Sequence, residues 1–251
     1  MSGHSKWATI KHKKAATDAR RGRAFTKLIR EISISARVGG SDPDSNPRLR
    51  TAIQAAKAEN MPNENIERAV QRGSGQLEGE HYEEVMFEGY GPGGVGMLIE
   101  VVTTNRNRVV SDIRHLMSKN GGNLAETGAV GWMFQRKGDL VVPKEAVEED
   151  KLLAIALEAG AEDVRDDGSA WEILTLPENF DQVREALVAA AIEPSSAEVG
   201  WIPQNYVTLT GTAANQMLRL VEGLEEHDDV QHVSANFDID EKEMQAAVGA
   251  E

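Results

Sequence analysis

Cysteine is absent from the 251 residues of this chain. The chain can therefore form no disulfide, no thiolate metal site and no cysteine nucleophile, which fits a reducing compartment. No run of eighteen apolar residues is present, so we expect no membrane-spanning helix. The N-terminus is basic but lacks the apolar stretch that a secretory signal needs, so we expect a cytoplasmic protein.

Basic residues are concentrated at the start of the chain. The first thirty residues hold nine of them and one acid, which gives this segment a net charge of +8 and leaves −22 for the remainder of a chain whose net charge is −14. The nine are Lys6, Lys11, Lys13, Lys14, Arg20, Arg21, Arg23, Lys27 and Arg30. Clustered lysine and arginine are typical of a surface that binds a phosphate backbone, so this segment predicts nucleic acid or the ribosome as partner. The alternative is a solvated leader without a partner.

The segment before the first helix mixes small residues with these cations. Trp7 offers a ring face on which an unpaired base could stack, but it could equally anchor the segment on its own domain. We expect His12 near the nucleic-acid backbone or a base. Phosphate would repel the acidic remainder, so that part of the chain should face away from the nucleic acid or meet a protein partner.

Three amphipathic helices are expected within the first 75 residues. The first begins near Asp18 and ends at Gly39-Gly40. The second begins at Pro47, with Asn46 as its N-cap, and the third runs from Asn63 to Gly73. Residues 73–80 have the composition of a linker, so these helices form a small domain of their own.

After the linker, short strands and helices alternate. The expected strands are Val85–Tyr90, Val95–Thr103, Ala129–Phe134, Leu140–Val142, Ala170–Leu176, Val199–Ile202, Tyr206–Thr210 and Val230–Phe237. The expected helices are Asn107–Lys119, Asp150–Ala159, Phe180–Ala191 and Ala213–Glu226. These units are too short for a doubly wound sheet, so we expect small α+β sandwiches of the split βαβ (ferredoxin-like) type. A chain of this length should form two or three domains.

Two motifs suggest phosphate binding, and their contexts differ. The glycine-rich stretch at residues 89–96 is followed by an apolar strand where a phosphate loop needs a helix, so it predicts a hairpin turn. Asn105 lies at a strand-to-helix junction, where it can cap the helix. Arg106 and Arg108 beside it are either a second phosphate contact or solvated charges.

The case for an enzyme or a metal site is thin. His227 and His232 flank two aspartates, but their spacing matches no zinc signature and an acidic turn explains it better. No Ser-His-Asp, HExxH or Walker pattern is present, so we expect no catalytic residue, no metal and no cofactor. An enzyme acting on nucleic acid would depend on a carboxylate or histidine, the candidates being Glu83, Glu84, Asp228 and His232.

Several segments resemble the YebC/PmpR family of probable transcriptional regulatory proteins, whose mitochondrial relative is known as a translational activator. The most specific matches lie before residue 135, and the match is looser between residues 136 and 205. The matching motifs are GHSKW (3–7), KHKKAATDARRGRAFTKLIREI (11–32), DPDSNPRLRTAI (42–53), NMPNENIERAV (60–70), EGYGPGG (88–94), TTNRNR (103–108), GGNLAETGAVGWMF (121–134), ALEAGAEDV (156–164) and DDVQHVSANFDI (228–239).

The resemblance implies three domains, the third inserted in the second. Their expected bounds are 1–75 for a basic helical domain, 76–135 with 206–251 for a discontinuous α+β domain, and 136–205 for the inserted α+β domain. It also implies a cytoplasmic protein without a cofactor that regulates gene expression through nucleic acid. Family members have been assigned to promoter DNA and to ribosomes during difficult translation.

We therefore expect a non-enzymatic, DNA-binding transcriptional regulator that uses a basic N-terminal arm and helix. The alternatives are a ribosome-associated translation factor that binds ribosomal RNA and relieves stalling, an enzyme acting on nucleic acid, and a protein-interaction scaffold. The nine basic residues above, with Trp7, His12, Arg106 and Arg108, are the candidate nucleic-acid contacts. Nothing in the arm specifies base readout, so binding should weaken steeply with salt.

Overall fold

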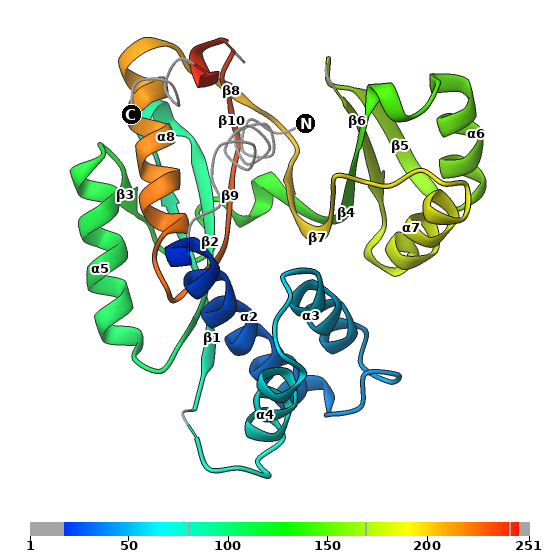
Figure 1. Cartoon of the computed structure of the whole chain (residues 1–251). Coiled ribbons are helices and arrows are strands. Elements are labelled where there is room, and N and C mark those ends of the chain that lie inside the picture. Colours follow the sequence, from blue (N-terminus) through cyan, green and yellow to red (C-terminus); the bar gives the residue numbers. More distant parts are fainter. Residues whose placement is uncertain (1–17, 80, 169, 241, 246–251) are drawn as a thin grey trace.

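The computed structural model describes residues 18–79, 81–168, 170–240 and 242–245, without the side chains of residues 18–21. Figure 1 shows a lobe of helices, a lobe in which long helices cover a sheet, and a lobe in which shorter helices cover a second sheet. Among the described residues, no helix is long and apolar enough to cross a membrane.

The described part of the N-terminal lobe consists of three helices, and the sequence predicts all three. They are α2 (Asp18–Gly39), α3 (Pro47–Ala58) and α4 (Asn63–Gly73). The side chain of Asn46 accepts a hydrogen bond from the backbone N–H of Leu49 at 3.1 Å, which confirms the predicted cap. Ile32, Leu49 and Ile66 lie in a small apolar core that joins the helices.

The first sheet is antiparallel and has the strand order β3-β1-β2-β9. Its strands are β1 (Glu83–Tyr90), β2 (Gly96–Thr103), β3 (Asn123–Leu124) and β9 (Val230–Ala235). Helices α5 (Arg106–Lys119) and α8 (Gly211–Glu225) cover one of its faces (Figure 1). Ile99, Ile113 and Leu220 belong to the core between the sheet and these helices. A short parallel pair, β8 (Val207–Thr208) and β10 (Phe237–Asp238), lies beside it.

The second sheet has the order β5-β6-β4-β7 and is also antiparallel. Its strands are β4 (Phe134–Pro143), β5 (Ala161–Asp166), β6 (Ala170–Thr175) and β7 (Ser196–Pro203), and its helices are α6 (Glu149–Glu158) and α7 (Phe180–Ala189). The element order β-α-β-β-α-β with this strand order is the split βαβ arrangement, so the predicted α+β class is confirmed.

Short 3₁₀ turns complete the chain: η1 (Pro92–Gly94), η2 (Gly131–Met133), η3 (Lys144–Ala146) and η4 (Pro177–Asn179). The first confirms the predicted turn, where Gly93 has a φ of 72° that favours glycine.

One predicted strand is wrong, and two strands were not predicted. Residues 129–133 form a loop that ends in η2, and β4 begins only at Phe134 and includes the expected strand at 140–142. The loop forms because the carboxylate of Glu88 accepts the backbone N–H groups of Val130 and Gly131, which a strand would have used. The missed strands are the two-residue β3 and the charged edge strand β5.

The second sheet is built from chain that lies between strands β3 and β9 of the first sheet. This topology supports our proposal that the chain divides at 1–75, 76–135 with 206–251, and an inserted 136–205. Because β4 already begins at Phe134, the start of the insert falls inside a strand.

Candidate nucleic-acid interface

Three of the candidate basic residues lie along one side of α2 and face the chain's own acidic turn. The turn, residues 225–229, begins at the last residue of α8 and leads into β9. Arg23 forms an ion pair with Glu226 at 3.3 Å. The Lys27 ammonium donates to the backbone carbonyl of Glu225 at 2.5 Å.

Arg30 makes the most buried contact of the three. Its guanidinium lies 2.7 Å from a carboxylate oxygen of Asp229, a side chain that is 1% exposed. It also donates to the Asp228 carbonyl and lies over the ring of Tyr82. A buried, charge-assisted contact of this kind loses far more on removal of one partner than an exposed ion pair does.

The Asp229 carboxylate contacts side chains from α2, α5 and β2. Arg108, from the first turn of α5, donates to the same carboxylate, and the Thr103 hydroxyl at the end of β2 donates to it at 3.1 Å. Arg30 reaches it from the helical lobe. The acidic turn therefore fixes where α2 lies against the first sheet.

Burial lowers the pKa of Lys27. The loss of solvent lowers its pKa from 10.5 to about 8, although the charges of Glu225 and Asp228 partly oppose the change. The neighbouring cations Arg23 and Arg30 add to the lowering. Near neutral pH, Lys27 is thus a partly buried cation with an internal acceptor.

The two arginines at the start of α5 have different roles. Asn105 accepts from the backbone N–H of Arg108 at 3.1 Å, so the expected helix cap is present. Arg108 points to Asp229. Arg106 is exposed, and no ion pair joins it to another residue in the described part of the chain. Of this pair, Arg106 is the one available to an external phosphate.

The remaining candidates lie beyond what the structure describes. Arg20 and Arg21 fall in the first turns of α2, where only the backbone is described. Six others lie outside the described residues altogether: Lys6, Trp7, Lys11, His12, Lys13 and Lys14.

The described residues hold no group of three histidine or acidic side chains placed to bind a metal ion. At the acidic turn, His227 instead faces Asp112 at 3.4 Å, and its other ring nitrogen accepts from the Asp229 backbone. Glu84, one of the candidate catalytic carboxylates, forms an ion pair with Arg48.

Sequence reasoning did not anticipate the contact between α2 and the acidic turn. The available signals were the Arg23, Lys27 and Arg30 spacing on one helix side and the acids clustered at residues 225–229. The two groups are separated by about 200 positions, and either could have been a solvated surface. It also missed the role of Glu88, which appears in the sequence as one more acid in a strand.

These features define a class of protein: an α+β chain whose N-terminal helical lobe docks through basic side chains on an acidic turn. Sequence models for two parts of one family match it. The model described as the TACO1/YebC protein N-terminal domain matches residues 5–76, and that for the TACO1/YebC second and third domain matches residues 82–237. The chain belongs to the TACO1/YebC family.

Individual relatives match over nearly their full length. A protein of Acidobacterium capsulatum is 62% identical over 97% of this chain and 98% of its own, and one of Koribacter versatilis is 57% identical over 99% and 100%. Both are called probable transcriptional regulatory proteins. The crystal structure of the conserved hypothetical protein Aq1575 from Aquifex aeolicus is 49% identical, with a TM-score of 0.82 over 92% of this chain and 96% of that one.

Proposed function

We propose that the protein is a non-enzymatic regulator of gene expression that binds nucleic acid, and that it acts as a DNA-binding transcriptional regulator. Its relatives are called probable transcriptional regulatory proteins, which supports a regulatory role. The observation that carries the proposal is the charge division between the first thirty residues, at +8, and the remainder, at −22. Such a cluster of cations supplies the electrostatic part of nucleic-acid affinity.

The described contacts suggest a division of labour among the basic residues. Arg23, Lys27 and Arg30 already have acceptors in the acidic turn, so binding phosphate would cost them those contacts. We propose that they mainly hold α2 in place. The phosphate contacts then come mostly from residues 6–14, from Arg20 and Arg21, and from Arg106.

The structure offers little support for the enzyme alternative. One of the candidate carboxylates already has a partner in the chain, because Glu84 pairs with Arg48. Substituting Glu83, Glu84, Asp228 or His232 should therefore leave the regulatory activity in place. Loss of regulation with intact nucleic-acid binding in one of these variants would favour an enzyme.

Ultraviolet crosslinking in living cells, followed by sequencing of the attached DNA and RNA, tests the proposal. A Lys11/Lys13/Lys14→Glu variant removes three cations and serves as the comparison. Enrichment of discrete promoter DNA that disappears in the variant supports transcriptional regulation. Enrichment of ribosomal RNA that disappears in the variant would instead make the protein a ribosome-associated translation factor. Equal amounts of crosslinked nucleic acid from the original protein and from the variant would contradict a role for the basic arm.

A further inference from the structure

A second candidate contact lies far from the basic arm in sequence, in the loop that joins β3 to β4. The Glu88 carboxylate, on β1 and 7% exposed, holds this loop. Its two oxygens accept backbone N–H groups from Gly128 at 2.7 Å, Val130 at 2.7 Å and Gly131 at 2.8 Å. Three charge-assisted hydrogen bonds to one buried carboxylate fix the backbone of a loop that has little regular structure.

This fixed loop presents a tryptophan to solvent. The side chain of Trp132 is 66% exposed, whereas Trp171 is buried and Trp201 is half-buried. The Trp132 indole N–H donates to the Ala129 carbonyl at 3.1 Å, and the hydroxyl of Tyr90 donates to the same oxygen at 3.2 Å. The one polar atom of the indole is therefore satisfied inside the loop, and the ring projects as an apolar surface held in place.

The surroundings of Trp132 differ in charge from the rest of the acidic body. From residue 80 onward the chain has 33 acidic and 12 basic residues, yet residues 127–138 and 199–206 contain no acid. These two stretches meet where β4 pairs with β7, Arg136 lying opposite Trp201. Arg136 is exposed and has no ion pair with another described residue. The acids that border these stretches in sequence are Glu126, Asp139 and Glu198. Asp139 is buried, whereas Glu126 and Glu198 are exposed. Glu88 is already bonded to the loop.

We propose that Trp132 is a stacking platform for an unpaired nucleobase, with Arg136 available to the adjoining phosphate. This inference rests on the proposed nucleic-acid-binding function and adds a second contact to it. Base stacking on an aromatic ring needs an exposed ring face and no base-specific donor, which is what the loop provides. The fixed loop loses little conformational freedom on binding, and the lack of acids within residues 127–138 lessens the repulsion that the acidic body exerts on phosphate.

Photocrosslinking of the full-length chain to single-stranded RNA and DNA oligonucleotides that carry 5-iodouracil tests the stacking directly. Trypsin separates the four tryptophans, because Trp7 falls in residues 7–11, Trp132 in 120–136, Trp171 in 166–184 and Trp201 in 185–219. We expect a crosslink in residues 120–136 that disappears in Trp132→Ala. A crosslink confined to the peptide of Trp7 would overturn the inference and leave the proposed function standing.

Affinity supplies the second readout. Trp132→Ala should weaken binding of a single-stranded oligonucleotide on the order of tenfold, while Trp132→Phe should stay within about threefold of the original chain. Leu157→Ala, which removes an exposed apolar side chain on α6, is the matched control and should change nothing. Unchanged affinity in Trp132→Ala would overturn the inference. So would binding of a proline-rich peptide, in place of the oligonucleotide, that depends on Trp132. If the proposed function itself is wrong, neither the original protein nor any of the variants should bind the oligonucleotide.

Discussion

Glu88 and Asp229 show how much a single buried carboxylate can organise. Glu88 accepts three backbone N–H groups and so determines the path of the loop before β4. Asp229 accepts from side chains of α2, α5 and β2, and so joins the helical lobe to the first sheet. In each case the desolvation cost of a buried charge is offset by several donors that a neutral residue of the same size would leave unsatisfied.

Replacing Glu88 by glutamine should destabilise the chain in a pH-dependent way. Burial alone would raise the Glu88 pKa, but the three N–H donors outweigh it and lower the pKa below its usual 4.5. The ionised form therefore stabilises the fold above about pH 4.5, and this contribution is lost as pH falls through the folded-state pKa. We expect Glu88→Gln to lower the free energy of unfolding by about 2 kcal/mol at pH 7 and by much less in acid.

Urea unfolding at pH 7 and in acid measures this difference. Glu126→Gln changes an exposed acid in the same loop and should have no comparable effect. Equal destabilisation of Glu88→Gln at both pH values would contradict the assigned role of its charge.

Lys27 also predicts a rise in stability with pH, but in the alkaline range, because folding disfavours its charged form. Its pKa is lowered to about 8 in the folded chain from an ordinary 10.5, so between these values the unfolded chain binds the proton more readily. Stability should therefore rise through this window, on the order of 2 kcal/mol from Lys27. Unfolding measured from pH 8 to 10 should show the rise in the original chain and a smaller one in Lys27→Met. Lys57→Met, at an exposed position, should keep the full rise.

At the scale of elements, the sequence predicts the structure where the controlling interactions are local. Asn46 and Asn105 cap helices within three residues of themselves, and both helix starts were predicted. The loop at residues 129–133 was predicted as a strand because its apolar residues suit one, whereas the Glu88 carboxylate that prevents it lies some forty residues earlier. The edge strand β5 is largely polar and has no apolar alternation, so the pattern gave no signal for it.

The docking of α2 on the first sheet should depend on Arg30. Arg30→Ala leaves Asp229 with one cationic partner fewer, so the helical lobe should sample a wider range of positions. The chain has no cysteine, so Lys57→Cys on α3 and Ser118→Cys on α5 provide two unique labelling sites for distance measurements by pulsed electron spin resonance.

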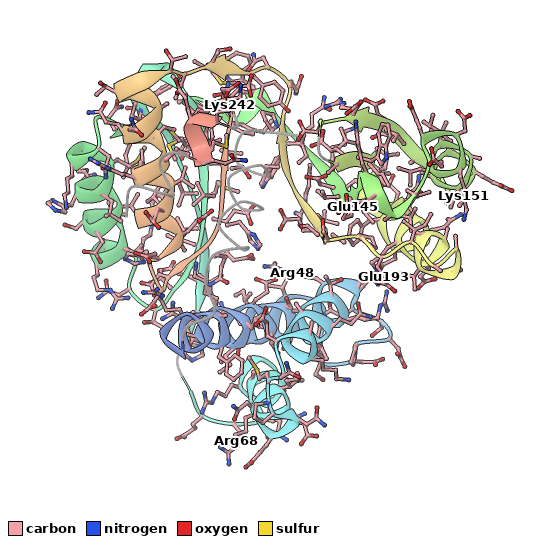
Figure 2. The ribbon with its side chains drawn as sticks, turned by 45° about the horizontal axis from the view of Figure 1, so that its top comes forward. Arg48, Arg68, Glu145, Lys151, Glu193 and Lys242 are labelled. Atoms are coloured by element: carbon pink, nitrogen blue, oxygen red, sulfur yellow. The ribbon has the colours of Figure 1, made fainter. Side chains whose placement is uncertain are left out.

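We expect a narrow distance distribution in the doubly labelled chain and a broader one when Arg30→Ala is added. Arg68→Ala is the matched control, because among the described residues Arg68 forms an ion pair with Glu64 of its own helix alone, and it extends away from the other lobes (Figure 2). An unchanged distribution in Arg30→Ala would show that other contacts hold the helical lobe.

At the scale of the whole molecule, charge is divided between a basic beginning and an acidic body. The sequence alone shows this division, and it therefore predicts the candidate interface in outline. It does not reveal which cations are already paired, because Arg23, Lys27 and Arg30 meet their acceptors about 200 residues later in the chain. Long-range pairing of this kind is decided by the packing of the lobes, which no local pattern records.

The salt dependence of oligonucleotide binding tests the central claim most directly. If about six phosphates are neutralised, affinity should fall on the order of a thousandfold between 50 and 200 mM salt. Lys11/Lys13/Lys14→Glu should bind much more weakly and with a shallower salt slope, whereas Arg68→Glu, on the far side of α4, should match the original chain. A nearly flat salt response in the original chain, or the same slope in the triple variant, would contradict the proposal that the basic N-terminal segment binds phosphate.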